Sequence, residues 1–188
     1  MNTLIVLIGL PGAGKSTFAG TLPGTLVSTD AIRKELYGGE SITLCEPTAQ
    51  KLLAEKKIPT DGLSPRELAA LKEFLCVDYV FDVARERCRR LLEQGNTVIY
   101  DSTNFKKKYR QQLLEKTRGT FRRCDAYFLD IPLDVCLARN AGRSRREPEA
   151  VITAIASQMV PPSYEEGFDN IYRVDSQGCV SRIPHQSY

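Results

Sequence analysis

The feature that most constrains this chain is a glycine-rich segment near its start that ends in lysine and serine. It reads Gly9-Leu10-Pro11-Gly12-Ala13-Gly14-Lys15-Ser16, follows the apolar run Leu4–Ile8 and precedes a helical pattern. Its glycines allow backbone N–H groups to turn inward around phosphates, and a helix start adds partial positive charge. A strand, such a loop and a helix in this order predict a site for the phosphates of a nucleoside triphosphate.

The residues of this loop have separate expected roles. Lys15 is expected to reach the β- and γ-phosphates, and the Ser16 hydroxyl is expected to ligate magnesium. The predicted cofactors are therefore ATP, or another nucleoside triphosphate, and Mg²⁺. A chance occurrence of the pattern is the alternative, but the preceding strand argues against it. The residues expected to contact the nucleotide are Gly9, Pro11, Gly12, Ala13, Gly14, Lys15, Ser16 and Thr17.

Short apolar runs alternate with helical patterns along the 188 residues, and this predicts an α/β fold. Near-continuous apolar runs are typical of parallel strands covered on both faces, so we expect a mostly parallel central sheet flanked by helices. The expected strands are Leu4–Ile8, Thr25–Ser28, Thr97–Tyr100, Ala126–Asp130 and, more weakly, Ile171–Val174. The expected helices are Val77–Gln94, Lys106–Thr117, Leu133–Arg139 and Pro148–Met159.

The domain organisation is expected to be a single domain over residues 1–188. Glycine and proline break up residues 38–66, which we interpret as an insertion between the second strand and the long helix. A short helix is expected within it, around Thr48–Lys56.

Composition narrows the class of protein. The net charge of +3 suits an anionic ligand but is too small to indicate nucleic acid by itself. With one histidine, His185, the sequence excludes His-based triads and His-rich metal sites. No apolar run approaches the length of a membrane span, and reduced thiols suit a cytoplasmic protein with no membrane partner. Four of the six cysteines lie in or beside apolar patterns and are expected to be buried: Cys76, Cys88, Cys124 and Cys136. The oligomeric state is left open.

Two carboxylates follow apolar strands. Asp101 comes directly after Thr97–Tyr100, where nucleotide-binding enzymes place a magnesium-directed carboxylate, although a helix cap is the alternative. Asp30 follows Thr25–Ser28 and opens a helix, with Arg33 one turn later. In an open α/β sheet that strand end faces the ligand crevice, where Asp30 could accept a hydroxyl proton and Arg33 could bind an anionic group. An N-cap aspartate beside a surface arginine is the other interpretation.

Two basic segments complete the set. Four arginines lie at the end of the expected helix Leu133–Arg139 and in the loop after it, at positions 139, 143, 145 and 146. They indicate a mobile lid that closes over the γ-phosphate, with a solvated surface loop as the alternative. The second segment, Lys106, Lys107, Lys108 and Arg110, is interpreted as a solvated helix start rather than as a binding groove.

The order of these motifs resembles the polynucleotide 5′-hydroxyl kinase family of the phage and bacterial end-healing type. The matching elements are the phosphate loop, Asp-x-x-Arg from Asp30, Asp-x-Thr-Asn from Asp101, Arg-Asn-x-x-Arg from Arg139 and the stretch Glu166–Asp169. The resemblance covers most of residues 3–175 except for 38–66. It implies a P-loop kinase fold with an arginine-rich lid, which transfers a phosphoryl group in line from ATP to a 5′-hydroxyl end of DNA or RNA.

The resemblance also implies roles for single residues. Asp30 would be the general base for the 5′-hydroxyl, and Arg33 would contact the phosphate of the first nucleotides. Arg143 would be the lid arginine on the β- and γ-phosphates, and Arg139 would lie near the nucleobase. Thr103 would contact the substrate, while Lys15 would act in catalysis beside Asp30 and Arg143.

The chain departs from that family in two ways that leave alternatives open. It has no Asp-x-Asp-x-Thr phosphatase motif, so the expected activity is confined to the kinase step. Its insertion at 38–66 lies beside the expected acceptor site and could change the substrate. A kinase of a small-molecule or tRNA-linked hydroxyl is therefore the first alternative. A nucleotide-binding regulatory module is the second, and the presence of Asp30 argues against it.

Overall fold

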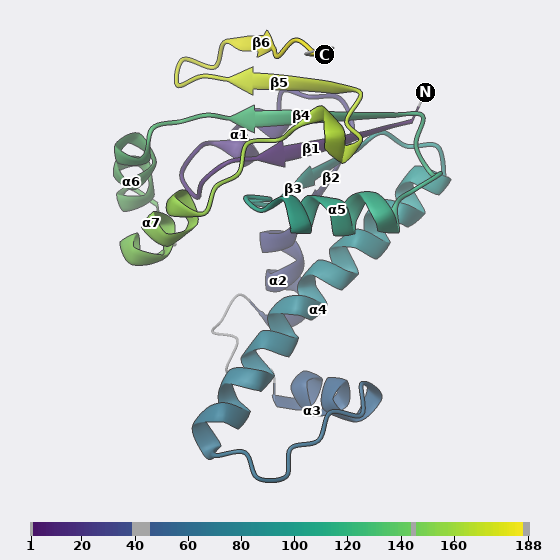
Figure 1. Cartoon of the computed structure of the whole chain (residues 1–188), viewed down its shortest axis with the longest axis vertical. Helices are drawn as coiled ribbons and strands as arrows, with labels where there is room; N and C mark the ends of the chain where they lie inside the picture. Colours follow the sequence, from purple (N-terminus) through teal and green to yellow (C-terminus); the bar gives the residue numbers. More distant parts are fainter. Residues whose placement is uncertain (1, 39–45, 144–145, 186–188) are drawn as a thin grey trace. The chain divides into compact units, whose positions relative to one another are not determined.

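The computed structural model describes residues 2–38, 46–143 and 146–185, whose elements are shown in Figure 1. These residues form two compact units, one made of residues 1–27 and 86–188, the other of residues 28–85. The first unit contains the central sheet, and the second is helical.

The central sheet has six strands in the order β2-β3-β1-β4-β5-β6. Strand β1 pairs in parallel with β3 and β4, β4 pairs in parallel with β5, and β6 is antiparallel to β5. The expected α/β fold with a mostly parallel sheet is confirmed. Because the side chains of β6 are all exposed, its sequence has no apolar run that would predict a strand. The bounds are β1 Thr3–Ile8, β2 Thr25–Ser28, β3 Val98–Asp101, β4 Arg123–Leu129, β5 Asn170–Val174 and β6 Val180–Arg182.

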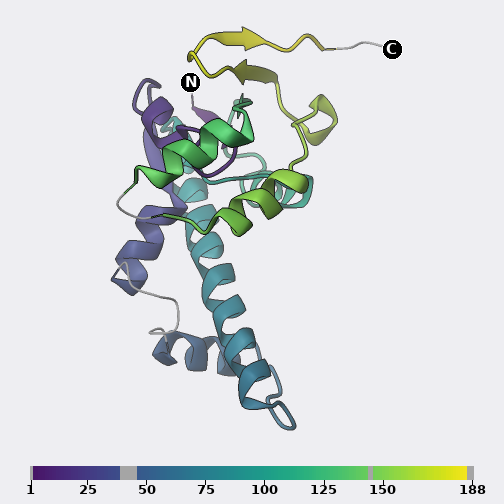
Figure 2. The same ribbon diagram turned by 90° about the vertical axis from the view of Figure 1, so that its left-hand side faces the viewer.

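The centre of the sheet is the core of the first unit. All six residues of β1 are buried, as are all four of β3, so these strands are covered on both faces. Helix α1 (Lys15–Ala19) packs on them, because Ala19 lies in one buried cluster with Ile5, Leu7 and Ile99. The unit also contains α5 (Lys107–Lys116), α6 (Leu133–Ala141) and α7 (Glu149–Ser157). Figure 2 shows α6 and α7 lying side by side. Each fully buried leucine or isoleucine of β1 stabilises the fold by about 1.5–3 kcal/mol before entropy is counted.

The second unit contains α2 (Thr29–Tyr37), α3 (Glu46–Glu55) and the larger part of α4 (Pro65–Glu93). The short helix expected around Thr48–Lys56 is present as α3, while residues 39–45 of the expected insertion lie outside the described residues.

The start of α4 differs from the sequence-based expectation, because the helix begins at Pro65 instead of Val77. The Glu67 N–H donates to Ser64 Oγ at 3.3 Å, and the Ser64 N–H donates to Glu67 Oε2 at 2.9 Å. This reciprocal pair is a capping box, and proline is favourable at the first helical position, where no N–H is needed. Pro65 therefore starts a helix in a segment that we expected it to break.

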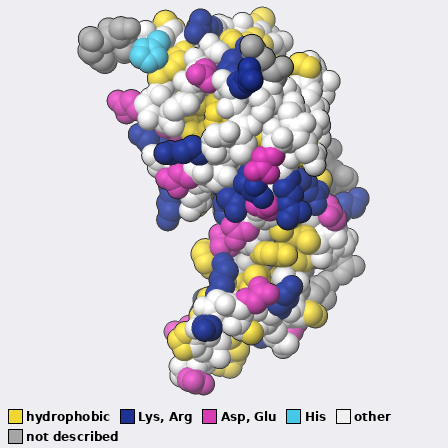
Figure 3. Space-filling view, turned by 90° about the vertical axis from the view of Figure 1, so that its right-hand side faces the viewer, with side chains coloured by type: hydrophobic (Ala, Val, Ile, Leu, Met, Phe, Trp, Pro, Cys, Tyr) yellow, Lys and Arg dark blue, Asp and Glu magenta, His cyan; other side chains and the backbone are white. Residues whose placement is uncertain are grey.

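Helix α4 has a buried apolar face, since Val80, Ala84, Cys88 and Leu92 are fully buried. Cys76, Cys88, Cys124 and Cys136 are buried, as expected, whereas Cys179 is exposed. On the face drawn in Figure 3, basic side chains are interspersed with acidic ones. Within the described ranges, every helix is too short or too polar to cross a membrane.

The buried thiols should be protected from alkylation in the native protein. Burial raises the pKa of Cys88, against a small opposing effect of Arg87, and burial with Asp125 and Asp169 raises that of Cys124. Since the thiolate is the nucleophile, both should stay unreactive with iodoacetamide at pH 8 until the protein unfolds. Peptide mapping by mass spectrometry should find Cys179, which is exposed, modified about tenfold faster or more than Cys88 and Cys124. Equal native rates at Cys88 and Cys179 would contradict this.

Candidate nucleotide-binding site

The glycine-rich loop connects β1 to α1, and its glycines are required by geometry. Gly12 and Gly14 have φ values of 85° and 93°, in the left-handed region that L side chains rarely adopt. A Cβ atom on Gly12 would lie 2.3 Å from the backbone oxygen of Cys136, so the loop packs directly on the backbone of α6. Helix α1 has only five residues, so the N–H groups of the loop and Lys15 contribute most of the attraction for phosphate.

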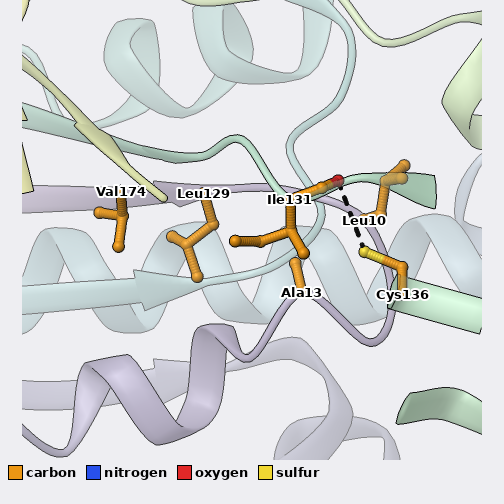
Figure 4. Close-up of a cluster of buried hydrophobic side chains, with 6 residues drawn as sticks. All are labelled: Leu10, Ala13, Leu129, Ile131, Cys136 and Val174. Atoms are coloured by element: carbon orange, nitrogen blue, oxygen red, sulfur yellow. Dashed lines mark hydrogen bonds between the residues drawn. The ribbon is translucent and has the colours of Figure 1, made fainter. Parts of the chain in front are cut away.

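A hydrophobic cluster lies beneath the loop and fixes its position (Figure 4). The loop contributes Leu10 and Ala13, and the rest come from the ends of β4 and β5 and from α6: Leu129, Ile131, Cys136 and Val174. The thiol of Cys136 donates to the Ile131 carbonyl at 3.7 Å. Because the cluster is packed, the loop backbone is held in shape before any ligand binds, which is what a phosphate cradle requires.

The charge of Lys15 lies over the loop itself. Its Nζ donates to the carbonyl oxygens of Gly9 and Leu10, both at 2.9 Å. Burial raises the pKa of the Cys136 thiol beside the loop, and the charges of Lys15 and Arg139 partly offset this rise.

Ser16 and Asp101 lie 85 residues apart in the sequence, and the fold brings their side chains together. Ser16 Oγ donates to Asp101 Oδ2 at 2.8 Å. Asp101 is the last residue of β3 and is 5% exposed. The helix-cap alternative for Asp101 is wrong, because Lys106 occupies the N-cap of the following helix, α5.

A hydroxyl and a carboxylate oxygen at this spacing fit magnesium, which prefers oxygen ligands. Magnesium at nucleotide sites takes one or two protein ligands and completes its shell with phosphate oxygens and water. Among the described residues there is no group of three or more His, Cys, Asp or Glu that could hold a metal ion, and this kind of site does not need one.

The segment after Asp101 is tied to the loop and to β1. The Gly9 N–H donates to the Thr103 carbonyl at 3.1 Å, so Thr103 adjoins the phosphate loop through its backbone. Asn104 is 3% exposed and donates from Nδ2 to the Leu7 carbonyl at 2.7 Å. Its φ of 48° is in the left-handed region, where asparagine is enriched, and that preference is the sequence signal for its role.

Arg110 corrects one interpretation from the sequence. We assigned it to a solvated basic cluster, but its side chain is fully buried and forms a two-bond pair with Glu166, both bonds at 2.7 Å. Its other three donors reach the carbonyls of Asn104 and Val160 at 2.9 Å and of Pro161 at 3.4 Å. All five guanidinium donors are thus used, and Arg110 joins the segment after β3 to the segment after α7.

The arginine-rich segment begins within α6, which ends at Ala141, two residues beyond the expected end at Arg139. Arg139 donates from Nη1 to the Ala13 carbonyl at 3.4 Å and so adjoins the phosphate loop. Arg143 and Arg146 are exposed, and Ser144 and Arg145 lie outside the described residues. Asn140 is 2% exposed and forms two hydrogen bonds with the backbone of Glu147. Asn140 Nδ2 donates to the Glu147 carbonyl at 2.8 Å, and the Glu147 N–H donates to Asn140 Oδ1 at 3.0 Å. This clamp, which the sequence did not predict, closes the base of the segment that carries Arg143.

Asp30 and Arg33 belong to the second unit. They lie on α2 and pair at 2.8 Å between Asp30 Oδ1 and Arg33 Nη1. The N-cap of α2 is Ser28, whose Oγ accepts the Ala31 N–H at 3.4 Å, so Asp30 is not the cap. The Asp30 side chain is 64% exposed and available to a substrate. Arg33 Nε is buried and makes no hydrogen bond within the described ranges.

Comparison with known proteins places this geometry in a family context. A family model described as AAA domain matches residues 4–162. None of the curated proteins compared with the chain matches it.

Solved structures share the fold at low sequence identity. A chain of the Pnkp1/Rnl/Hen1 RNA repair complex is 19% identical with a TM-score of 0.59; the match covers 84% of this chain and 44% of that one, so this chain spans less than half of that relative. A sugar kinase from Janibacter sp. HTCC2649 is 18% identical with a TM-score of 0.58, and the match covers 93% of this chain and 86% of that one. Kti12 of Chaetomium thermophilum, solved with ADP-AlF3, is 15% identical with a TM-score of 0.58, and the match covers 92% of this chain and 89% of that one.

The close approach of the loop to α6 predicts a specific effect of Gly12→Ala. The methyl group would meet the Cys136 carbonyl at 2.3 Å and would also force an unfavourable φ, which alone costs about 1–2 kcal/mol. We expect ATP affinity, measured by calorimetry, to fall at least tenfold, because the phosphate cradle must shift. Gly95→Ala is the matched control, since Gly95 has a φ of 86° with nothing within 4 Å. It should lose stability but keep ATP affinity, and an equal loss of affinity in both variants would contradict the argument.

The buried pair predicts a large stability effect for Arg110→Met. Removing one partner leaves Glu166 buried without its counter-charge and three carbonyls without donors, which should cost about 3–5 kcal/mol in urea unfolding. Arg173→Met is the control, because Arg173 pairs with Asp130 at 2.8 Å on the surface. Its loss should not exceed about 1 kcal/mol. Similar losses in the two variants would show that burial of Arg110 is unimportant.

Proposed function

Because the chain belongs to the AAA domain family, we propose that it is an ATP-dependent kinase that phosphorylates the 5′-hydroxyl end of a polynucleotide, DNA or RNA. The observation that carries the proposal is the 2.8 Å contact between Ser16 and Asp101 beside Lys15. It supplies the two oxygens and the cation that phosphoryl transfer from a nucleoside triphosphate needs. We further propose that both units act as one kinase domain.

The proposed reaction is a direct in-line displacement. The oxygen of the acceptor hydroxyl attacks the γ-phosphorus, and Asp30 accepts the proton of that hydroxyl. The bond between the γ-phosphorus and the β–γ bridging oxygen breaks, and ADP is released. Lys15 and Arg143 stabilise the charge that develops on the phosphoryl oxygens. Magnesium, held by Ser16 and Asp101, would neutralise charge on the β- and γ-phosphates. Arg139 lies beside the nucleotide, consistent with its 3.4 Å contact to Ala13.

Two features support a polynucleotide as the acceptor. The buried Nε of Arg33, without a partner in the described part of the chain, is a costly arrangement unless an anionic ligand uses the guanidinium. A phosphodiester next to the acceptor hydroxyl is such an anion, and Thr103 is proposed as a further substrate-binding residue. The fold likeness to a chain of an RNA repair complex is consistent with this acceptor.

The alternative acceptor is a small-molecule or tRNA-linked hydroxyl. A fold likeness of nearly the same TM-score to a sugar kinase supports it, and Asp30 would serve such an acceptor equally well. A nucleotide-binding regulatory module is the remaining alternative. It does not need a base for an acceptor hydroxyl, so acceptor-dependent turnover separates it from the two kinases.

A label-transfer assay tests the proposal. With magnesium and γ-labelled ATP, label should pass to a single-stranded 5′-hydroxyl oligonucleotide and not to the same strand with a 5′-phosphate. Asp30→Asn should lower kcat by about 10²–10⁴-fold, because the general base is lost. Asp82→Asn is the matched control, since Asp82 and Arg85 form the same (i, i+3) pair at 2.8 Å on α4. Its kcat should be unchanged.

The outcomes separate the candidate functions. If Asp30→Asn transfers label to oligonucleotides as fast as wild type, the assignment of Asp30 as the general base is wrong. Transfer to a metabolite or to charged tRNA in an acceptor screen, with none to oligonucleotides, would replace the favoured acceptor. ATP hydrolysis that no acceptor stimulates would favour the regulatory module.

A further inference from the structure

A surface at the start of α5 combines two aromatic rings with a lysine. It consists of Phe105, Lys106 and Tyr109, which we call the aromatic–lysine patch. The two rings meet edge to face, with centroids 5.4 Å apart and planes at 67°. The Lys106 ammonium lies 5.4 Å from the Phe105 centroid and 6.0 Å from that of Tyr109. Tyr109 is 39% exposed, which is high for a residue that usually buries its ring.

The patch is held rigidly next to the candidate site. It follows directly on the segment Asp101–Asn104, whose Thr103 carbonyl accepts the Gly9 N–H of the phosphate loop. Arg110, buried with all its donors used, immediately follows Tyr109 and anchors it. In Figure 1 the start of α5 lies at the sheet edge where β1 and β4 end. An aromatic pair of a half-buried Phe105 and an exposed Tyr109, on so constrained a backbone, loses little conformational freedom when a ligand packs on it.

The residues that adjoin the patch are apolar and basic. The Val160 N–H donates to the Phe105 carbonyl at 2.8 Å, so Val160, which is 45% exposed, adjoins Phe105 through the backbone. Lys107 and Lys108 follow Lys106 along the chain, and the nearest acidic partner of Lys107 is Glu165 at 3.8 Å. A partly exposed pair of rings beside cations matches a ligand with flat faces and negative charges, and single-stranded nucleic acid has both.

We propose that the aromatic–lysine patch is a stacking platform for a base near the 5′ end of a single-stranded acceptor, with Lys106 and its neighbours on the adjoining phosphates. The proposal rests on the proposed function, because it supplies the binding energy that holds a polynucleotide end at that site. Stacking tolerates every base, since each has a π face, so the patch gives affinity for single strands without sequence preference. Tyr109 acts as a binding residue that sets acceptor class and takes no part in the chemistry.

The test pairs a change in the protein with a change in the ligand. Wild type, Tyr109→Ala and Tyr109→Phe would be titrated with fluorescent 5′-hydroxyl oligonucleotides, with normal or abasic nucleotides at the first three positions. Tyr109→Ala should weaken binding of the normal strand about tenfold by anisotropy and leave the abasic strand unaffected. Tyr109→Phe, which keeps the ring, should bind like wild type. Val180→Ala, on the exposed edge strand β6, controls for loss of an exposed apolar side chain.

Kinetic measurements on the same variants separate the patch from the proposed function. Tyr109→Ala should raise KM for the oligonucleotide about tenfold with kcat and the thermal midpoint unchanged. Equal losses on normal and abasic strands, no loss, or no binding of oligonucleotides by wild type would each overturn the patch. Base-dependent binding through Tyr109 without phosphoryl transfer would keep the patch and overturn the proposed function. Phosphoryl transfer to oligonucleotides with a KM that Tyr109→Ala does not alter would keep the proposed function and overturn the patch.

Discussion

The burial of Arg110 against Glu166 is the interaction on which the arrangement of the candidate site depends. A guanidinium out of water is tolerated when its donors are satisfied, and here two reach a carboxylate and three reach backbone carbonyls. Those carbonyls belong to Asn104, Val160 and Pro161, so one side chain holds the segment after β3 to the segment after α7. Neither segment has regular secondary structure at these points, and Arg110 supplies the order that a strand or helix would otherwise provide.

The same device recurs around the phosphate loop, where side-chain amides tie loops together. Asn104 fastens the segment after β3 to the end of β1, and Asn140 closes the base of the arginine-rich segment. The loop itself lies between the backbone of α6 and a hydrophobic cluster. Groups that meet phosphate must be oriented before the ligand arrives if they are to favour the transition state, and these contacts orient them. In the aromatic–lysine patch, by contrast, the ring of Tyr109 is 39% exposed and is therefore available to a ligand.

Much of the candidate site could be predicted because its signals are local. The glycine-rich loop, the strand before it and the carboxylates after β2 and β3 were read from consecutive residues, and the structure has them in those places. The start of α4 was missed although its signal was local, since Ser64 and Glu67 form a capping box that we read as a break at Pro65. Strand β6 was missed for a different reason, because an exposed edge strand needs no apolar alternation.

The sequence by itself determined the phosphate loop, the α/β order and the apolar faces, because each depends on backbone freedom or hydrophobicity within a few neighbouring residues. The tertiary structure alone decided that Ser16 meets Asp101 and that Arg110 is buried. Their partners lie 85 and 56 residues away, and no local pattern marks which of many charged residues will pair. An arginine two to four residues after three lysines looks solvated by composition. It becomes a core residue only because the fold brings a carboxylate and three carbonyls to it.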